Sequence, residues 1–169
     1  RTAIIYDFDG TLAPGCMQEH GLLQYLGYPD PLAFWARTKQ AAQQWDADEI
    51  LIYMKLLLES GKTLTRQKLT EEGAKVPLFE GLEQWFERVN QFGVELGLEL
   101  EHYIISSGLE EMVQGCSIRK HFRRVYASRY CYNQAGIAVW PASAINYTTK
   151  TQFLFRINKG VDSTYENRQ

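Results

Sequence analysis

Two acidic residues two positions apart, Asp7 and Asp9, follow a short apolar run at residues 2–6. The run is rich in strand-forming residues and is typical of a buried strand in a parallel sheet. Side chains alternate along a strand, so both carboxylates can project into one space at its carboxyl end, where open parallel sheets bind ligands. Two carboxylates this close repel each other unless a cation or a shared proton intervenes, and such an oxygen-rich pocket suits Mg²⁺. A solvated Asp-Gly turn is the alternative.

Ser106, Ser107, Gly108 and Lys150 are the other candidates for chemistry. The Ser-Ser-Gly segment follows a second apolar run and leads into a helix expected from Leu109 onward. A hydroxyl beside main-chain N–H groups at the start of a helix can bind phosphate, although the segment also fits an ordinary strand-to-helix turn. Lys150 opens the final helix, where a cation is unfavourable with the helix dipole unless it faces carboxylates and a phosphoryl group. A solvated surface lysine is the alternative.

The elements that must position these residues alternate between strands and helices. Strands are expected at residues 2–6, 102–105, 125–127 and 137–140, and this alternation predicts an α/β fold with a parallel sheet and helices on both faces. Residues 15–75 show helical periodicity only. We therefore expect an all-helical insertion there, and a core made of residues 1–14 and 76–169.

Apolar residues at helical spacing indicate which helix faces should be buried. One stripe is expected in the insertion, at Ile50, Leu51, Met54, Leu57 and Leu58. A second is expected on a long helix, at Leu82, Trp85, Phe86, Val89, Phe92 and Leu96. The aromatic residues Trp35, Trp45 and Tyr53 are interpreted as core of the insertion rather than as a substrate pocket, although one or two of them could face the site. The basic cluster at residues 119–124 is interpreted as a solvated helix end.

Length and composition limit the number of domains, the partners and the cellular location that can be expected. The chain has 169 residues, is 45% hydrophobic and carries a formal charge of −2, which is enough for one real core and gives no general reason to expect a nucleic-acid or membrane partner. No apolar run approaches the roughly 20 residues that cross a bilayer, and no signal peptide is recognised. Cys16, Cys116 and Cys131 form no CxxC pair and are interpreted as reduced thiols, so a cytoplasmic location is expected.

The order of these motifs resembles that of the haloacid dehalogenase-like hydrolase superfamily. Residues 6–12, with the sequence Tyr-Asp-Phe-Asp-Gly-Thr-Leu, are similar to its first motif, Ser106 to its second and Lys150 to its third. The resemblance extends from residue 3 to about residue 158 and implies a Rossmann-like core. The helical insertion lies where the family places a helical cap and resembles the cap of phosphoserine-phosphatase-like members.

The resemblance implies a Mg²⁺-dependent phosphatase that acts on a phosphorylated small molecule. Asp7 would attack phosphorus and form an aspartyl-phosphate, and Asp9 would serve as general acid and then as general base. Mg²⁺ would be bound by Asp7 and by the main-chain carbonyl of Asp9. The phosphoryl oxygens would be held by Ser106 and Lys150, with a smaller contribution from Thr11 and from the neighbouring Ser107 and Gly108.

One departure from the family pattern limits this expectation. The fourth motif is an acidic pair after a further strand, and it completes the metal site. After Lys150 the only acids are Asp162 and Glu166, in a polar segment with no apolar strand before them. The chain is therefore expected to lack this motif and to bind Mg²⁺ weakly. A catalytically incomplete member that acts as a ligand-binding or phosphorylation-responsive module is the alternative function.

Overall fold

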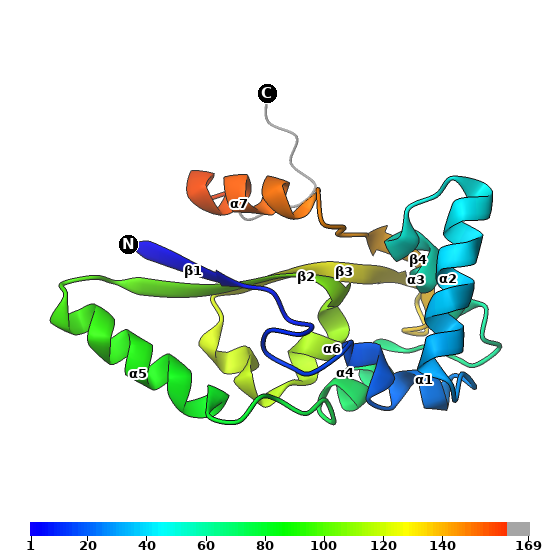
Figure 1. Cartoon of the computed structure of the whole chain (residues 1–169), viewed down its shortest axis with the longest axis horizontal. Coiled ribbons are helices and arrows are strands. Elements are labelled where there is room, and N and C mark those ends of the chain that lie inside the picture. Colours follow the sequence, from blue (N-terminus) through cyan, green and yellow to red (C-terminus); the bar gives the residue numbers. More distant parts are fainter. Residues whose placement is uncertain (162–169) are drawn as a thin grey trace.

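A computed structural model describes residues 1–161 of the chain and contains a four-stranded sheet in the order β1-β2-β3-β4. Its strands are β1 (Thr2–Tyr6), β2 (Leu100–Leu109), β3 (Arg124–Tyr132) and β4 (Ala138–Ser143). β1 and β3 both pair with β2 in parallel, so three strands point their carboxyl ends to the same edge (Figure 1). The predicted α/β class and all four strand positions are confirmed.

The fourth strand differs from the expected parallel arrangement. β4 pairs with β3 antiparallel, with Cys131 opposite Trp140. The connection between the two strands is a short turn in which Asn133 Oδ1 accepts from the N–H groups of Ala135 and Ile137, both at 3.0 Å. A turn this short can join only antiparallel neighbours, because a parallel connection needs a crossover of a dozen or more residues. The sheet is therefore mixed.

The segment between β1 and the next long helix is helical, as expected. It contains the 3₁₀ helix η1 (Met17–Glu19), α1 (Leu22–Tyr25), α2 (Pro31–Trp45), α3 (Glu49–Leu58) and α4 (Arg66–Gly73). Side-chain caps begin three of them. Asp30 accepts from main-chain N–H groups at the start of α2, Asp48 does so at the start of α3, and Thr65 at the start of α4. Such caps satisfy donors that have no partner within the helix.

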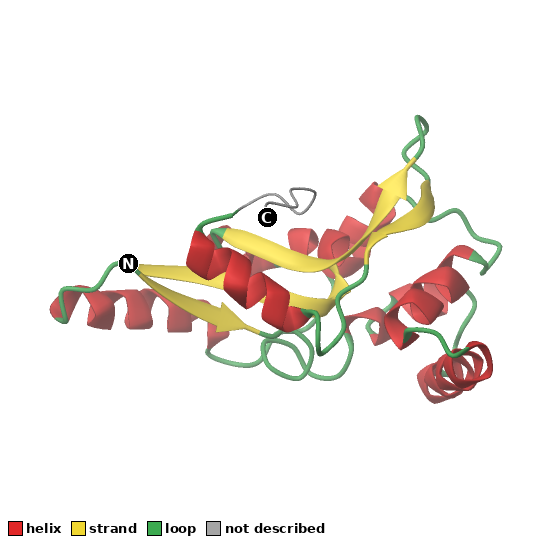
Figure 2. Cartoon of the chain, turned by 90° about the horizontal axis from the view of Figure 1, so that it is seen from above, coloured by secondary structure: helices red, strands yellow, loops and turns green. Residues whose placement is uncertain are grey.

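The remaining helices cover the two faces of the sheet. One face carries α5 (Leu82–Glu95), α6 (Glu110–Gly115) and the 3₁₀ helix η2 (Ser117–His121), and α7 (Lys150–Lys159) lies on the opposite face (Figures 1 and 2). Beneath α7 a small apolar cluster joins the helix to the strands. Its buried members are Tyr103, Ile105, Tyr126, Ile145 and Phe153. The prediction of helices on both faces is confirmed.

The helix α4 lies unusually close to α6. A Cβ atom placed on Gly73 would be 1.9 Å from the carbonyl oxygen of Met112, and one on Gly115 would be 2.0 Å from that of Thr70. The main apolar cluster is also continuous from the helical segment into the sheet layer, and it includes Met54 and Val113. The boundaries at residues 14 and 75 stay a prediction, with α4 packed directly on an element of the expected core.

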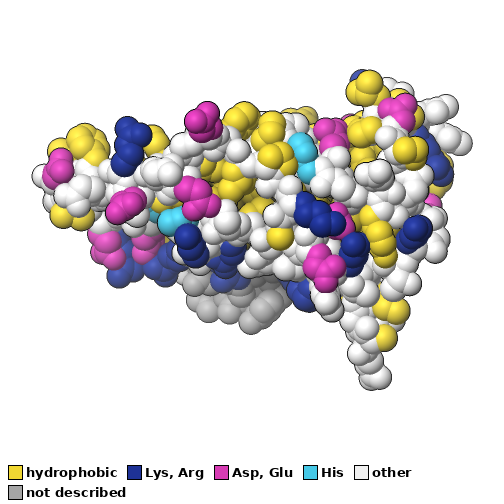
Figure 3. Space-filling model, turned by 90° about the horizontal axis from the view of Figure 1, so that it is seen from below, with side chains coloured by type: hydrophobic (Ala, Val, Ile, Leu, Met, Phe, Trp, Pro, Cys, Tyr) yellow, Lys and Arg dark blue, Asp and Glu magenta, His cyan; other side chains and the backbone are white. Residues whose placement is uncertain are grey.

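The expected buried side of α5 is largely wrong. Phe86 is fully buried, but Trp85, Phe92 and Leu96 are 41%, 59% and 58% exposed. Phe86 stacks on His121, with ring centroids 4.5 Å apart, and so anchors the helix. Periodicity shows which residues share a face of a helix but not whether another element covers it. In the view from below, hydrophobic side chains lie among charged ones on this side of the molecule (Figure 3).

Candidate active site

The candidate site forms where β1 ends and α7 begins. Asp7 follows the last residue of β1, and Lys150 is the first residue of α7. Lys150 Nζ lies 2.7 Å from Asp7 Oδ2, and Asp7 Oδ1 accepts from the N–H of Phe8 at 2.8 Å. The predicted partnership of a cation with these carboxylates is thus present in the structure, and the ammonium lies where it can neutralise the Asp7 charge.

A tight loop after β1 sets the direction of the acidic residues. The N–H of Leu12 donates to the carbonyl of Phe8 at 2.8 Å, and the N–H of Gly10 donates to the carbonyl of Ala13 at 2.8 Å. Gly10 has a φ of 72°, in the left-handed region that favours glycine. Phe8 and Leu12 are buried and anchor the loop, whereas Thr11 is exposed. The structure places Thr11 on this loop without showing a contact between its hydroxyl and the acids.

Asp9 is held in a less polar environment. Its Oδ1 accepts from the N–H of Met17 at 2.9 Å. Burial raises the pKa of Asp9 to about 6; the Met17 hydrogen bond lowers it, the nearby charge of Asp7 raises it and that of Lys150 lowers it. A carboxyl with a pKa in this range can both give and take a proton near neutrality.

The Ser-Ser-Gly segment lies at the junction of a strand and a helix, as expected. β2 continues through it to Leu109, and α6, only six residues long, begins at Glu110. Ser106 is fully buried and its Oγ accepts from the N–H of Gly108 at 3.0 Å. The helix expected from Leu109 onward therefore begins one residue later, and the two serines lie at the end of the strand before it.

Gly108 nevertheless brings this segment next to the acids. A Cβ atom at Gly108 would lie 3.2 Å from Asp9 Oδ2 and 2.3 Å from Met17 Cε. The carbonyl of Ser107 accepts from the Tyr53 hydroxyl at 2.8 Å, which ties the segment to α3. The structure thus assembles Asp7, Asp9, Gly108 and Lys150. Ser106 lies two positions before Gly108, and its hydroxyl accepts from the Gly108 N–H.

A cavity of about 280 Å³ opens beside Asp9. Most of its wall comes from residues of the helical segment, and it is lined by Asp9, Cys16, Gln18, Trp35, Glu49, Ile50, Tyr53 and Ser107. Two of the three aromatic residues interpreted as core, Trp35 and Tyr53, line this cavity. Sequence reasoning did not single out Gln18 or Glu49. Their only signal was their position in the segment expected to carry specificity.

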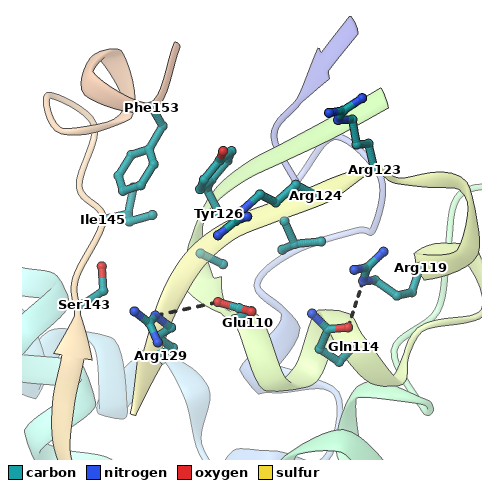
Figure 4. Close-up of a pocket in the computed structure, with 12 residues that line it drawn as sticks. Glu110, Gln114, Arg119, Arg123, Arg124, Tyr126, Arg129, Ser143, Ile145 and Phe153 are labelled. Carbon is teal, nitrogen blue, oxygen red and sulfur yellow. Dashed lines mark hydrogen bonds and ion pairs between the residues drawn. The ribbon is translucent and has the colours of Figure 1, made fainter. Parts of the chain in front are cut away.

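A larger hollow, of about 450 Å³, lies at another part of the sheet and is strongly basic. Arg119, Arg123, Arg124 and Arg129 line it (Figure 4). Arg119 Nε donates to Gln114 Oε1 at 2.8 Å, and Arg129 Nε lies 3.9 Å from Glu110 Oε2. None of the predicted site residues lines this hollow, so it is separate from the acidic pair. The arginines interpreted as a solvated helix end form its wall.

The described residues supply few metal ligands. No group of three or more His, Cys, Asp or Glu side chains within residues 1–161 is arranged to hold a metal ion. Asp162 and Glu166, which follow the expected third motif, lie outside the described residues. The Asp7 carboxylate and a main-chain carbonyl are hard oxygen donors of the kind Mg²⁺ accepts, and Mg²⁺ usually keeps several waters.

Two further expectations can be compared with the structure. Cys16, Cys116 and Cys131 are all free, as predicted. Across residues 1–161, no helix combines the length and apolar character needed to cross a membrane.

Comparisons with known proteins place this geometry in context. No family model matches the chain. An uncharacterised protein of Borreliella burgdorferi is 26% identical over 186 residues, a match that covers 94% of this chain and 65% of that protein. The chain therefore spans less than two thirds of the length of this relative.

Solved structures provide closer matches in shape. A HAD-family hydrolase of Salmonella enterica serovar Typhi has a TM-score of 0.67 at 16% identity, with 94% of this chain and 51% of that chain covered. A phosphoserine phosphohydrolase-like protein of Francisella tularensis has a TM-score of 0.63 at 20% identity, with 96% and 75% covered. A phosphoserine phosphatase with an analogue of its phospho-aspartyl intermediate has a TM-score of 0.61 at 15% identity, with 95% and 73% covered. The chain has the fold of the haloacid dehalogenase-like hydrolases, and phosphoserine phosphatases are among its structural neighbours.

Proposed function

We propose that the protein is a phosphomonoester phosphatase that works through an aspartyl-phosphate. The observation that carries this proposal is the contact between Lys150 and Asp7, with Asp9 close by in a setting that raises its pKa to about 6. A nucleophilic carboxylate, a neutralising cation and a separate acid are the groups that phosphoryl transfer to a carboxylate needs. The phosphatases among the structural neighbours support the same reaction class.

In the first step, an Asp7 carboxylate oxygen attacks phosphorus and the ester P–O bond breaks. The leaving alkoxide takes the proton from the Asp9 carboxyl, so the alcohol departs neutral and Asp9 becomes a carboxylate. Lys150 Nζ lies where it can contact both Asp7 and a phosphoryl oxygen, and its charge offsets the negative charge that gathers on the transferring group.

In the second step, the Asp9 carboxylate removes a proton from water, and the water oxygen attacks phosphorus. The bond between Asp7 and phosphorus breaks, which releases inorganic phosphate and restores the Asp7 carboxylate and the Asp9 acid. In this proposal the main chain at Ser107 and Gly108 and the Thr11 hydroxyl bind phosphoryl oxygens. For Ser106 we propose the same role, which requires its buried hydroxyl to exchange its bond with the Gly108 N–H.

The Asp7 carboxylate and the main-chain carbonyl of Asp9 would hold Mg²⁺ as a cofactor, since both are oxygen donors of the kind that this ion accepts. When bound, it would supply positive charge that reduces repulsion between Asp7 and the phosphate dianion. Lys150 supplies a fixed part of the same neutralisation from the protein itself. The three free cysteines are in keeping with a reducing compartment such as the cytoplasm.

The test is release of phosphate from p-nitrophenyl phosphate by the full-length protein, with and without Mg²⁺. Asp7→Asn should abolish turnover because an amide does not form the acyl-phosphate. Asp46→Asn is the matched control, since Asp46 lies at the end of α2 with a φ of 48°, a conformation that asparagine accepts well. Turnover that survives Asp7→Asn would refute the proposed nucleophile. Phosphate binding without any turnover would favour the alternative of a ligand-binding module.

A further inference from the structure

The cavity beside Asp9 is the space available to the alcohol half of a phosphate ester. Asp9 and Ser107 form its inner wall, and the helical segment supplies the rest. At about 280 Å³ it holds a small group and not a second large moiety. Its chemistry therefore indicates which alcohols the proposed phosphatase accepts, and the inference below rests on that proposed function.

Two aromatic rings meet at a corner of this cavity. The rings of Trp35 and Tyr53 have centroids 5.7 Å apart and lie at 76° to each other. The two rings pack edge to face and Tyr53 is only 2% exposed, so Trp35 is the ring whose negative face can attract a cation in the cavity. Ile50 adds an apolar surface.

Two side-chain hydrogen-bond donors of these walls are already used. Trp35 Nε1 donates to Glu19 Oε1 at 2.7 Å, and the Tyr53 hydroxyl donates to the Ser107 carbonyl. The α3 N-terminus is capped as well, since Asp48 Oδ1 accepts from the N–H groups of Ile50 and Leu51 at 2.9 and 3.1 Å. An anionic substituent on the alcohol would find few donors here.

The cavity lining carries acidic side chains, in contrast, at Asp9 and Glu49. Glu49 contributes a carboxylate to the wall. Gln18 is 2% exposed, and its Oε1 has no hydrogen-bond partner among the described residues. Burial of an acceptor without a donor is costly, and this oxygen is too deeply buried for a group in the cavity to reach it unless the side chain turns. Within residues 1–161, no lysine or arginine lines this cavity.

We propose that the cavity binds a positively charged amino or ammonium group, so that the preferred substrates are phosphate esters of small amino alcohols without a carboxylate. The cation would rest against the Trp35 ring. Glu49 supplies the opposite charge. The phosphate would remain with Lys150, so each end of the substrate meets a charge of opposite sign.

A matched set of esters tests this inference. The values of kcat/KM are measured for phosphocholine, for its uncharged isostere 3,3-dimethylbutyl phosphate, and for phosphoglycolate, which carries a carboxylate. We expect phosphocholine to exceed the isostere at least about tenfold and phosphoglycolate by more, because shape is matched in the first comparison and only charge differs.

Variants identify the residue that provides the preference. Glu49→Gln should reduce the ratio of phosphocholine to isostere by about tenfold. Glu71→Gln, an exposed change on α4 away from the cavity, should preserve the ratio. Calorimetric titration with choline and with 3,3-dimethylbutanol provides a second measurement that does not depend on turnover, and choline should bind more tightly.

The outcomes separate the two proposals. If p-nitrophenyl phosphate is hydrolysed but the isostere or phosphoglycolate equals phosphocholine, or if Glu49→Gln leaves the ratio unchanged, the cation-binding cavity is wrong and the phosphatase stands. If no ester is hydrolysed while choline still binds more tightly than 3,3-dimethylbutanol, the phosphatase is wrong and the cavity stands.

Discussion

Lys150 Nζ and Asp7 Oδ2 are 2.7 Å apart although 143 positions separate the two residues in the chain. The contact joins the end of β1 to the first turn of α7, which lies on the opposite face of the sheet from α5 and α6. A cation in the first turn of a helix opposes the helix dipole. The nearby Asp7 carboxylate compensates, and the same arrangement leaves a positive charge at the place where a phosphoryl group would transfer.

Replacement of this cation should impair the reaction more than the fold. For Lys150→Ala we expect kcat/KM toward p-nitrophenyl phosphate to fall by roughly a hundredfold or more, the magnitude typical for loss of one group that stabilises transition-state charge. Steady-state kinetics of the full-length protein measure this loss. Lys159→Ala, at the other end of the same helix, is the control and should keep the parent rate. Similar rates for the two variants would remove Lys150 from the proposed mechanism.

The pH dependence should report Asp9. The first proposed step needs Asp9 protonated, and burial raises the pKa of Asp9 to about 6. The fraction in the acid form therefore falls above that pH, and kcat/KM for an alkyl phosphate should decline by about tenfold per pH unit. The ionisation of the ester itself is titrated separately by phosphorus NMR and divided out. Asp9→Asn should lower the rate and abolish this decline of kcat/KM at higher pH. A decline that persists in the variant would have to be assigned to another group.

Asp9 should also affect stability: the residue that the reaction needs should make the fold less stable at high pH. Its pKa is about 6 in the folded chain against 3.8 in the reference state, so the folded state favours the protonated form. Below pH 3.8 Asp9 is protonated in both states and does not destabilise the fold. As pH rises through about 6, the buried carboxyl ionises in the folded state, and the free energy of unfolding reaches its full reduction. In EDTA at pH 8, Asp9→Asn should raise the free energy of unfolding by up to about 3 kcal/mol.

Urea denaturation at pH 8 and at pH 4 measures this difference. The Met17 N–H retains an acceptor in the variant, because asparagine keeps the side-chain oxygen. The increase in the free energy of unfolding caused by Asp9→Asn should shrink toward zero at pH 4, where the parent carboxyl is largely protonated in the folded state. A gain that is equal at both pH values, or a loss at pH 8, would contradict burial of the Asp9 charge.

The contact between α4 and α6 should be sensitive to a single methyl group. Gly73→Ala would place Cβ 1.9 Å from the Met112 carbonyl oxygen, a main-chain atom that cannot move without displacing α6. We expect a loss of about 3 kcal/mol in the free energy of unfolding. Gly93→Ala is the matched control in α5, since its Cβ would meet the flexible end of the Leu100 side chain. Thermal or urea unfolding should show a clearly smaller loss for the control, and equal losses would contradict the tight helix contact.

Much of the fold was predictable because it depends on local patterns. The apolar run before Asp7 and the run before Ser106 predicted β1 and β2, whose burial on both faces leaves continuous hydrophobic segments. The direction of β4 was not predictable from strand and helix order alone, because the short turn at Asn133 determines it. The exposed face of α5 was missed for a related reason: the presence of a packing partner is a property of the tertiary structure.

The sequence by itself determined the candidate reacting groups of the proposed site: Asp7 and Asp9 at the end of the first strand, and Lys150 at the start of the last helix. Alternation along a strand and position along a helix suffice for that, since both are local geometry. Only the tertiary structure decided that Lys150 contacts Asp7, that the Ser106 hydroxyl turns to its own main chain, and that Trp35, Tyr53 and Glu49 line a cavity beside Asp9. Those relationships join segments far apart in the chain, and the packing of the helical segment against the sheet sets them.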